Sequence, residues 1–320
     1  MAWLLLPLVC AYLCFVCYRL SAIEASPERT WGPRSLARLL TSLSFGSAAL
    51  VGARVKSFEG AGLEADRSRA TTSPHPKPDP LRLNPLFSTD PQPLLPVFHP
   101  HGFVAYCATM IISKYAVRAE PHGTEWYAAC APILFKVPLL GDIITITNGR
   151  SVAKESLEAL LKAGKTVALQ PGGTKEQAVT RHDQEQAFFS NKLGFIRLAI
   201  KYGRPLIPMY IFGENQLYRR VPGMEWLSRL IHKLTGLTLP IVTAKWGLPQ
   251  AGLLPIATDI HVRWGRVVEV GDPEENPSEA RVEEVFARYL EELNRMFDEN
   301  AYECLPADVA ARGLHIVRLK

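Results

Sequence analysis

The chain has 320 residues, 48% of them hydrophobic and 21% charged, so it can bury a core and is not disordered as a whole. It has no glycine period and no sustained heptads, and its one or two long apolar runs are too few for a multi-pass channel. The net charge of +5 is too small to indicate nucleic-acid binding, but it suits an anionic membrane surface or a phosphate-bearing ligand. Six cysteines are too few for a disulfide scaffold and favour a reduced, cytosol-facing body.

An uncharged, mostly apolar run occupies residues 2–18. It lacks the basic start and the small-residue cleavage site of a signal peptide, so it predicts a retained membrane anchor over residues 1–20. Arginines follow it, which predicts a body on the cytosolic side. A second apolar stretch, residues 36–53, contains Arg38 and several hydroxyl side chains. It favours a re-entrant or membrane-surface segment within residues 21–64 over a second crossing.

Residues 65–93 are rich in proline and predict an irregular linker before a folded domain at 94–320. In that domain the patterns predict strands and helices in alternation: strands at 94–98, 166–169 and 206–212, and helices at 151–162 and 193–202. A final helix is expected after the capping sequence Asn276-Pro277-Ser278-Glu279, with proline at its first position. This helix has an apolar stripe that consists of Val282, Val285, Phe286, Tyr289, Leu293, Met296 and Phe297. The alternation predicts an α/β fold.

The sequence His99-Pro100-His101-Gly102 stands at the end of the first of these strands. Sharp turns after strands are where α/β folds place reactive groups. A histidine near its ordinary pKa can take a proton from a hydroxyl that attacks a carbonyl, and Gly102 leaves room for a substrate. Two structural histidines in a turn are the main alternative. A His-x-His zinc site is another, with Cys107 as its one nearby further ligand.

Two related patterns favour structural roles. Pro121-His122-Gly123 repeats part of the histidine motif but follows no clear strand, which is typical of a loop. Cys14 and Cys17 form a C-x-x-C inside the first apolar run, where small apolar filling is favoured over metal or redox chemistry.

A glycine-containing loop, Gln170-Pro171-Gly172-Gly173-Thr174-Lys175-Glu176, follows the strand expected at 166–169. Its glycines expose backbone N–H groups, which can bind an oxyanion or a phosphate, and Lys175 adds positive charge. Glu176 could orient a histidine or stay in solvent. The loop is not a Walker A sequence, and a plain strand-to-helix turn is the alternative.

Two further segments end in polar side chains. A strand expected at 143–147 would deliver Arg150 to a loop, where it could clamp a phosphate or a carboxylate or simply lie at the surface. The strand at 206–212 is followed by Glu214 and Asn215, which suit a pocket wall, although Glu214 could equally be a structural acceptor. Residues 224–234 form an apolar face beside several cations, which indicates a membrane-surface helix or a core-facing one.

The order of these motifs resembles the type-2 diacylglycerol acyltransferase family, the His-Pro-His-Gly branch of the glycerolipid acyltransferase superfamily. The resemblance covers about residues 94–300. It is carried by His99-Pro100-His101-Gly102, Phe135-Lys136-Val137-Pro138, the block from Gly141 to Arg150, Pro171-Gly172-Gly173 with Glu176, Gly194-Phe195-Ile196-Arg197-Leu198-Ala199, Pro208 and Phe212-Gly213-Glu214-Asn215. It implies a glycerolipid-acyltransferase-like mixed sheet flanked by helices, with an N-terminal apolar membrane anchor and an acyltransferase domain at 94–320.

The resemblance implies a membrane-bound O-acyltransferase that moves a fatty acyl group from acyl-CoA to a lipid hydroxyl, with diacylglycerol as acceptor and triacylglycerol as product. The alternatives are a monoacylglycerol, wax-ester or lysophospholipid acyltransferase, a lipid hydrolase, or a non-catalytic lipid-binding protein of the same fold. Val104 and Tyr106 stand where the wider superfamily has an aspartate after its histidine, so that partner is unassigned.

The resemblance also implies roles for residues. His101 is the expected general base, His99 supports it or shares the role, and Glu176 orients it, with Glu214 as second choice. Substrate contacts are expected from Gly102, Arg150, Pro171, Gly172, Gly173, Lys175, Glu214 and Asn215, with Arg150 and Lys175 on CoA phosphates or the glycerol side. No metal or redox cofactor is expected, because this acyl transfer needs none, and acyl-CoA is counted as a substrate.

The expected partners are acyl-CoA, a neutral glycerolipid and a membrane, without nucleic acid, and a homo-oligomer is left open. The expected location is the endoplasmic reticulum membrane with the body facing the cytosol, and the lipid droplet is the alternative.

Overall fold

The computed structural model describes residues 2–51, 53–60, 93–105, 126–236, 239–244, 247, 249–250 and 254–319. Most of the linker expected at 65–93 and the sequence Pro121-His122-Gly123 lie outside these residues, as does Cys107.

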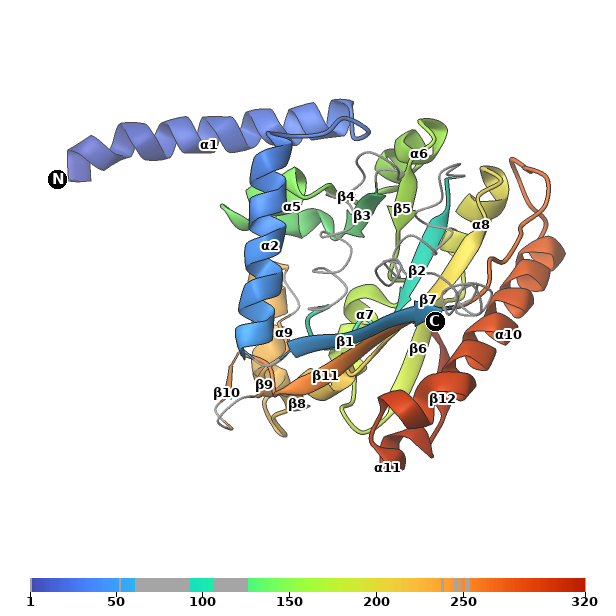
Figure 1. The fold of residues 1–320 in the computed structure, drawn as a ribbon. Coiled ribbons are helices and arrows are strands. Elements are labelled where there is room, and N and C mark those ends of the chain that lie inside the picture. Colours follow the sequence, from blue (N-terminus) through green and yellow to red (C-terminus); the bar gives the residue numbers. More distant parts are fainter. Residues whose placement is uncertain are drawn as a thin grey trace, which may run out of the picture.

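The central feature is a mixed sheet built in two parts (Figure 1). One part has the order β1-β11-β7-β2, formed by β1 Ala53–Gly60, β11 Thr258–Trp264, β7 Leu206–Phe212 and β2 Leu95–His99. β2 is parallel to β7, β11 is antiparallel to β7, and β1 is parallel to β11. The other part has the order β4-β3-β5 and is parallel, formed by β4 Gly149–Ser151, β3 Trp126–Cys130 and β5 Thr166–Ala168.

Backbone hydrogen bonds join the two parts. Phe98 N donates to Leu169 O at 2.8 Å, and Leu169 N donates to Pro96 O at 2.9 Å. The strand order is therefore continuous across the molecule as β1-β11-β7-β2-β5-β3-β4. Because β2, β3, β4 and β5 are mutually parallel, their carboxyl ends meet at one edge, which is where α/β folds place ligands.

Two smaller sheets complete the strands. β6 Glu185–Ser190 pairs in parallel with β12 Leu314–Leu319. β8 Arg219–Arg220, β9 Val242–Thr243 and β10 Pro249–Gln250 form an antiparallel ribbon.

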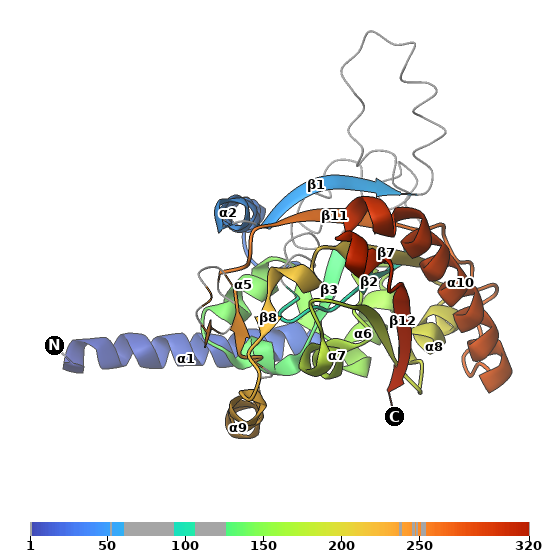
Figure 2. The same ribbon diagram turned by 90° about the horizontal axis from the view of Figure 1, so that it is seen from below.

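Helices flank the sheet (Figures 1 and 2). The short ones are α5 Leu140–Ile146, α6 Lys154–Lys162, α7 Gly173–Val179, α8 Gly194–Lys201, α11 Ala307–Ala310 and the 3-10 turns η3 Pro132–Lys136 and η4 Asn215–Leu217. The long C-terminal helix, α10 Glu279–Cys304, buries the whole apolar stripe expected from the sequence. Its N-cap is Ser278, whose hydroxyl accepts a hydrogen bond from Arg281 N at 3.2 Å. The prediction that Pro277 occupies the first helical position is therefore wrong, because Pro277 lies one residue before the cap.

The strand expected at 143–147 is wrong, because this segment forms α5. Thr145 Oγ1 donates to Gly141 O at 2.6 Å, and Thr147 Oγ1 donates to Ile143 O at 2.9 Å, so both hydroxyls bond within the helix. A short apolar run cannot by itself distinguish helix from strand. The expected cap at Ser151 is also displaced: α6 begins after Ala153, and Ser151 Oγ accepts from Ala153 N at 3.1 Å.

Two helices, α1 Ala2–Ala25 and α2 Arg34–Val51, precede the sheet. Arg19 fixes α1 to the body: its buried guanidinium forms an ion pair with Asp142 at 3.0 Å and donates to Phe135 O at 2.6 Å. Among the described residues, no helix combines the length and apolar character needed to cross a membrane, so the spanning anchor expected at residues 1–20 is not supported.

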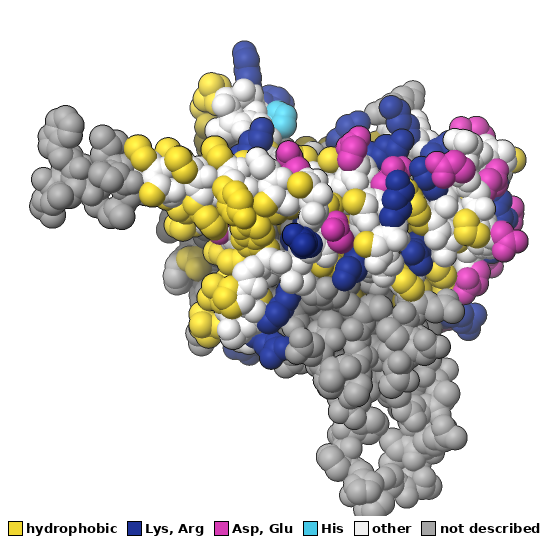
Figure 3. Space-filling model, turned by 90° about the horizontal axis from the view of Figure 1, so that it is seen from above, with side chains coloured by type: hydrophobic (Ala, Val, Ile, Leu, Met, Phe, Trp, Pro, Cys, Tyr) yellow, Lys and Arg dark blue, Asp and Glu magenta, His cyan; other side chains and the backbone are white. Residues whose placement is uncertain are grey.

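Large apolar side chains are exposed on the helices at one side of the molecule. They are Val9, Leu13, Phe15 and Tyr18 of α1, Leu36, Leu39 and Leu43 of α2, and Leu140 and Ile143 of α5. Figure 3 shows hydrophobic side chains gathered on the side from which α1 projects. The amphipathic α9 Glu225–Thr235 buries no residue and exposes Trp226, Leu230 and Leu234, so the core-facing alternative for residues 224–234 is wrong.

Candidate active site

The two histidines of the motif lie at the carboxyl end of β2. All five residues of this strand are buried, and the bond from His99 to Pro100 is cis. Gly102 turns the chain with φ of 67°, and a Cβ there would lie 2.7 Å from Glu214 Cγ. Glycine is therefore required by both the backbone conformation and the close approach of Glu214.

His99 lies inside the core. Its Nε2 is 2.9 Å from the Tyr289 hydroxyl of α10, and its ring packs against Phe189 with centroids 5.1 Å apart. Burial lowers the pKa of His99 to about 3, so the ring is neutral at physiological pH. Because the side chain is fully buried, His99 fits a supporting role better than direct proton transfer.

His101 is half-buried at the surface of the turn. Its Nδ1 lies 3.4 Å from Gly102 O, and burial lowers its pKa below the ordinary value, although this backbone contact opposes the shift. A neutral ring whose Nδ1–H faces a carbonyl leaves Nε2 free to accept a proton. The environment of His101 therefore suits a general base.

Side chains from α7 hold the main chain of the histidine loop. His101 N donates to Glu176 Oε1 at 2.6 Å, and Gln177 Nε2 donates to Phe103 O at 2.6 Å. Thr180, the residue after the helix, donates through Oγ1 to Gly102 O at 3.4 Å. Glu176 was expected to orient a catalytic histidine, and its contact is with the backbone of His101.

The Glu176 carboxyl group is buried. Its pKa is raised to about 8, chiefly by burial and also by the nearby Glu185, while the backbone N–H groups of His101 and Phe188 oppose the shift. Gly172 lies directly against this carboxyl group, since a Cβ there would be 1.9 Å from Glu176 Oε2. Gly172 is thus required for Glu176 to fold back against the start of its own helix.

A second buried carboxyl group, Glu185 of β6, was missed by the sequence analysis. It accepts from the Tyr210 hydroxyl at 2.6 Å, from Asn215 Nδ2 at 2.9 Å and from Gln216 Nε2 at 2.9 Å. Burial raises the pKa of Glu185, and these three donors oppose the shift. Asn215, which was expected to contact substrate, is instead buried against Glu185. Glu185 was missed because it lies in a polar stretch of sequence, residues 183–186, and nothing in that stretch predicts burial.

The remaining residues of the glycine-containing loop lie at the sheet edge. Gln170 Nε2 donates to Pro100 O at 3.4 Å, which joins this loop to the histidine motif. Pro171 is half-buried, and Lys175 is exposed on α7. Gly173 has φ of 50° and starts α7.

Arg150 has a different environment from the one expected. It is buried and donates to the carbonyls of Pro27 at 2.6 Å, Thr145 at 3.1 Å and Gly149 at 2.7 Å, and also to Arg29 O. In this arrangement the guanidinium ties the turn between α1 and α2 to the end of β4. Its contact with CoA stays a prediction.

The first-helix cysteines are exposed and free: Cys10, Cys14 and Cys17. Among the residues that the structure describes, no three His, Cys, Asp or Glu side chains are grouped to hold a metal ion.

Comparisons with known proteins identify the family of this chain. The family model described as diacylglycerol acyltransferase matches residues 87–307, which include both histidines, the glycine-containing loop and all of α10. The chain belongs to this family. It is 30% identical over 219 residues to diacylglycerol O-acyltransferase 2B of Umbelopsis ramanniana, covering 63% of this chain and 62% of that protein.

The relatives differ in the acceptor for which they are named. The chain is 30% identical to 2-acylglycerol O-acyltransferase 1 of Bos taurus, over 63% of this chain and 64% of that protein. It is 26% identical to human diacylglycerol O-acyltransferase 2, over 63% of this chain and 55% of that protein. The match thus spans somewhat less than two thirds of these relatives. No solved structure matches the chain.

Proposed function

We propose that the protein transfers a fatty acyl group from acyl-CoA to the hydroxyl of diacylglycerol and releases triacylglycerol and free CoA. The observation that carries the proposal is that His101 and the buried Glu176 lie side by side at the end of β2. His101 is half-buried with a lowered pKa, and its main chain is held by the buried Glu176. Membership of the diacylglycerol acyltransferase family supports the same reaction.

In the proposed reaction, the oxygen of the acceptor hydroxyl attacks the thioester carbonyl while His101 Nε2 takes the proton of that hydroxyl. A new C–O bond forms, the C–S bond breaks, and the imidazolium returns its proton to the CoA thiolate. A positioned base contributes about 10²–10⁴-fold to such a step. His99, bonded to Tyr289 and buried behind the loop, acts by positioning the strand end.

The charge that develops on the carbonyl oxygen needs hydrogen-bond donors. We assign this role to backbone N–H groups at Gly172-Gly173, whose loop meets the histidine motif through Gln170 and Pro100. One such donor typically contributes about 2.7–4 kcal/mol to the transition state. Lys175 is exposed beside this loop and is proposed to contact the polar part of a substrate. The reaction requires no metal or redox cofactor.

Monoacylglycerol is the second candidate acceptor. It is favoured by the 2-acylglycerol O-acyltransferases among the relatives, one of which is 31% identical to this chain. Both acceptors present a glycerol hydroxyl to the same base, so the chemistry is shared and the difference lies in the space for a second acyl chain.

We further propose that the body docks on a membrane surface through α1, α2 and α9. Their exposed apolar side chains would enter the boundary between headgroups and acyl chains, and Arg229 and Lys233 of α9 would face anionic lipid. In this placement the lipid acceptor would reach the enzyme from the membrane, and acyl-CoA would reach it from the aqueous side. The cytosolic face of the endoplasmic reticulum is the proposed location.

The deciding experiment offers labelled acyl-CoA to purified protein in liposomes with diacylglycerol, monoacylglycerol, a long-chain alcohol or lysophosphatidate. We expect triacylglycerol as the main product, and a loss of about 10²–10⁴-fold in kcat for His101→Ala. His315→Ala is the matched control, because this exposed histidine lies on β12.

Full activity of folded His101→Ala would remove this histidine from the mechanism. Free fatty acid without ester would instead make the protein a hydrolase. No turnover by folded wild type with any acceptor would favour the lipid-binding alternative.

A further inference from the structure

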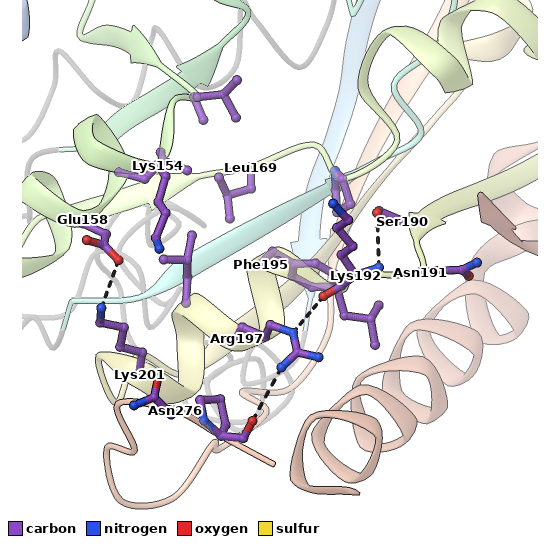
Figure 4. Close-up of a pocket in the computed structure, with 18 of the residues that line it drawn as sticks. Lys154, Glu158, Leu169, Ser190, Asn191, Lys192, Phe195, Arg197, Lys201 and Asn276 are labelled. Atoms are coloured by element: carbon purple, nitrogen blue, oxygen red, sulfur yellow. Dashed lines mark hydrogen bonds and ion pairs between the residues drawn. The ribbon is translucent and has the colours of Figure 1, made fainter. Parts of the chain in front are cut away.

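A cavity of about 1090 Å³ opens at the carboxyl edge of the sheet, between α6, α8 and the start of α10 (Figure 4). This volume is at the upper end of small-molecule pockets, which are typically about 300–1,000 Å³. Leu169, Gln170 and Pro171 form one wall, so the cavity borders the loop that meets the histidine motif. Its location is therefore suited to a large substrate whose reactive end reaches His101.

Four cations line the cavity: Lys154, Lys192, Arg197 and Lys201. Two of them are already paired with acids of the same wall. Lys201 forms ion pairs with Glu158 at 3.0 Å and Glu275 at 2.7 Å, and Arg197 pairs with Glu279. Figure 4 shows the pair of Lys201 with Glu158, and also the hydrogen bond that Arg197 donates to the backbone carbonyl of Lys192.

Lys154 and Lys192 differ from the other two cations. Both are exposed, and neither forms an ion pair with any other residue that the structure describes. The ion pairs of the wall acids are with Lys201 and Arg197, and Lys154 only adds a longer-range attraction to Glu158, so both lysines keep their side-chain donors for a ligand. A polyanion that enters the cavity would meet them first.

The backbone adds to the positive potential. Lys154 is the first residue of α6 and Gly194 the first of α8, and neither helix has a side-chain cap. The N-terminal ends of both helices carry partial positive charge and unbonded N–H groups. At Gly194 a Cβ would meet no described atom within 4 Å, so the chain is open toward the cavity there.

The lining also has an apolar part, which includes Leu157, Leu169 and Phe195, and a few uncharged polar side chains such as Gln170 and Asn276. Such a mixture fits a ligand that combines phosphates with a flat ring and a neutral chain. Free inorganic phosphate would use only the cations, and a lipid headgroup would leave the apolar part unfilled.

We propose that this cavity binds the phosphorylated nucleotide end of acyl-CoA on Lys154 and Lys192, so that the thioester follows the Gln170-Pro171 wall to His101. The inference rests on the proposed acyl-transfer function and assigns a donor site distinct from Arg150 and Lys175. The acceptor then approaches from the lipid side.

The test compares wild type with Lys154→Ala/Lys192→Ala in liposomes, in both turnover and CoA-binding measurements. Lys162→Ala is the matched control, because Lys162 is the exposed last residue of α6, at the end away from the cavity. Each lost contact with phosphate should raise the KM for acyl-CoA about threefold, and the double variant about tenfold, with kcat and the KM for diacylglycerol unchanged. The dissociation constant of CoA should rise by the same factor, and 3′-dephospho-CoA should be less affected.

The outcomes separate the two proposals. Ester formation with a KM for acyl-CoA equal to that of Lys162→Ala overturns the cavity assignment and leaves the function intact. A change confined to the KM for lysophosphatidate also overturns it, because the cavity would then hold an acceptor headgroup. CoA binding that depends on both lysines, without ester from any acceptor, supports the cavity and overturns the acyl-transfer function.

Discussion

Two regions of the molecule place their side chains in opposite ways. Behind the histidine loop, the carboxyl groups of Glu176, Glu185 and Glu214 are buried. On α1, α2 and α9, by contrast, large apolar side chains such as Leu39 and Leu234 are exposed. Burying a carboxyl group costs free energy unless it is hydrogen-bonded or protonated, and exposing an apolar stripe costs free energy unless another surface covers it. The cost of the buried carboxyl groups is offset by hydrogen bonds within the chain. The cost of the exposed apolar side chains can be offset only by a surface outside the chain.

The largest expected effect is on Glu185. Glu185→Ala would leave the donors of Tyr210, Asn215 and Gln216 without their acceptor in the core. We expect a loss of about 4 kcal/mol in the free energy of unfolding, because each unsatisfied buried donor costs about 1–3 kcal/mol. Urea unfolding measures it. Glu283→Ala, at an exposed ion pair of α10, is the control. A loss no greater than that of the control would mean that the buried network contributes little to stability.

The next effect is a pH dependence. The pKa of Glu176 is raised to about 8 in the fold, while the unfolded chain ionises near the ordinary value of 4.5. The folded state therefore binds more protons between these values, and its stability falls as pH rises from about 5 to 8, by up to roughly 4 kcal/mol. Glu176→Gln should flatten this slope while its amide oxygen still accepts from His101 N.

Thermal unfolding across pH 5 to 8 is the measurement. The raised pKa of Glu185 adds to the same slope, so the variant should be shallower without being flat. Parallel curves for wild type and variant would show that Glu176 ionises freely in the folded protein.

The smallest effect tests the exposed region. Leu39→Ser/Leu43→Ser changes two exposed positions on α2 and should leave folding unchanged. If α2 inserts into lipid, the loss is about 1 kcal/mol per half-inserted leucine, or roughly 30-fold in vesicle partitioning for both. Flotation with anionic liposomes measures it, beside Tyr302→Ser on the exposed side of α10. Equal flotation of both variants would exclude α2 from the membrane-facing side.

Patterns that depend on local periodicity predicted the fold well. The strand at 206–212 and the apolar stripe of α10 were predicted from residue spacing alone, and His99 was placed correctly at a strand end. Failures came where tertiary contacts decide: residues 143–147 form a helix, and Arg150 bonds carbonyls of the α1–α2 turn that lie more than a hundred positions away.

The candidate site was only partly accessible from sequence. His101, Gly102 and Glu176 are recognisable because their motif is contiguous and family-like. Glu185 and Tyr289 are not, since a polar residue in a strand and a tyrosine in an apolar stripe give no sign of their partners. The lysines of the cavity come from α6, α8 and the turn between β6 and α8, and only the folded chain brings them together.

Arg150 has one more consequence. It lies in β4, beside the edge where the histidine loop and the cavity open, and it bonds the carbonyls of Pro27 and Arg29 between α1 and α2. Tyr127 of β3 reinforces this by donating to Glu28 O at 2.7 Å. The turn between α1 and α2 is thus held to the sheet by hydrogen bonds from two neighbouring strands. If α1 and α2 dock on lipid as proposed, these bonds would also orient the sheet edge relative to the bilayer.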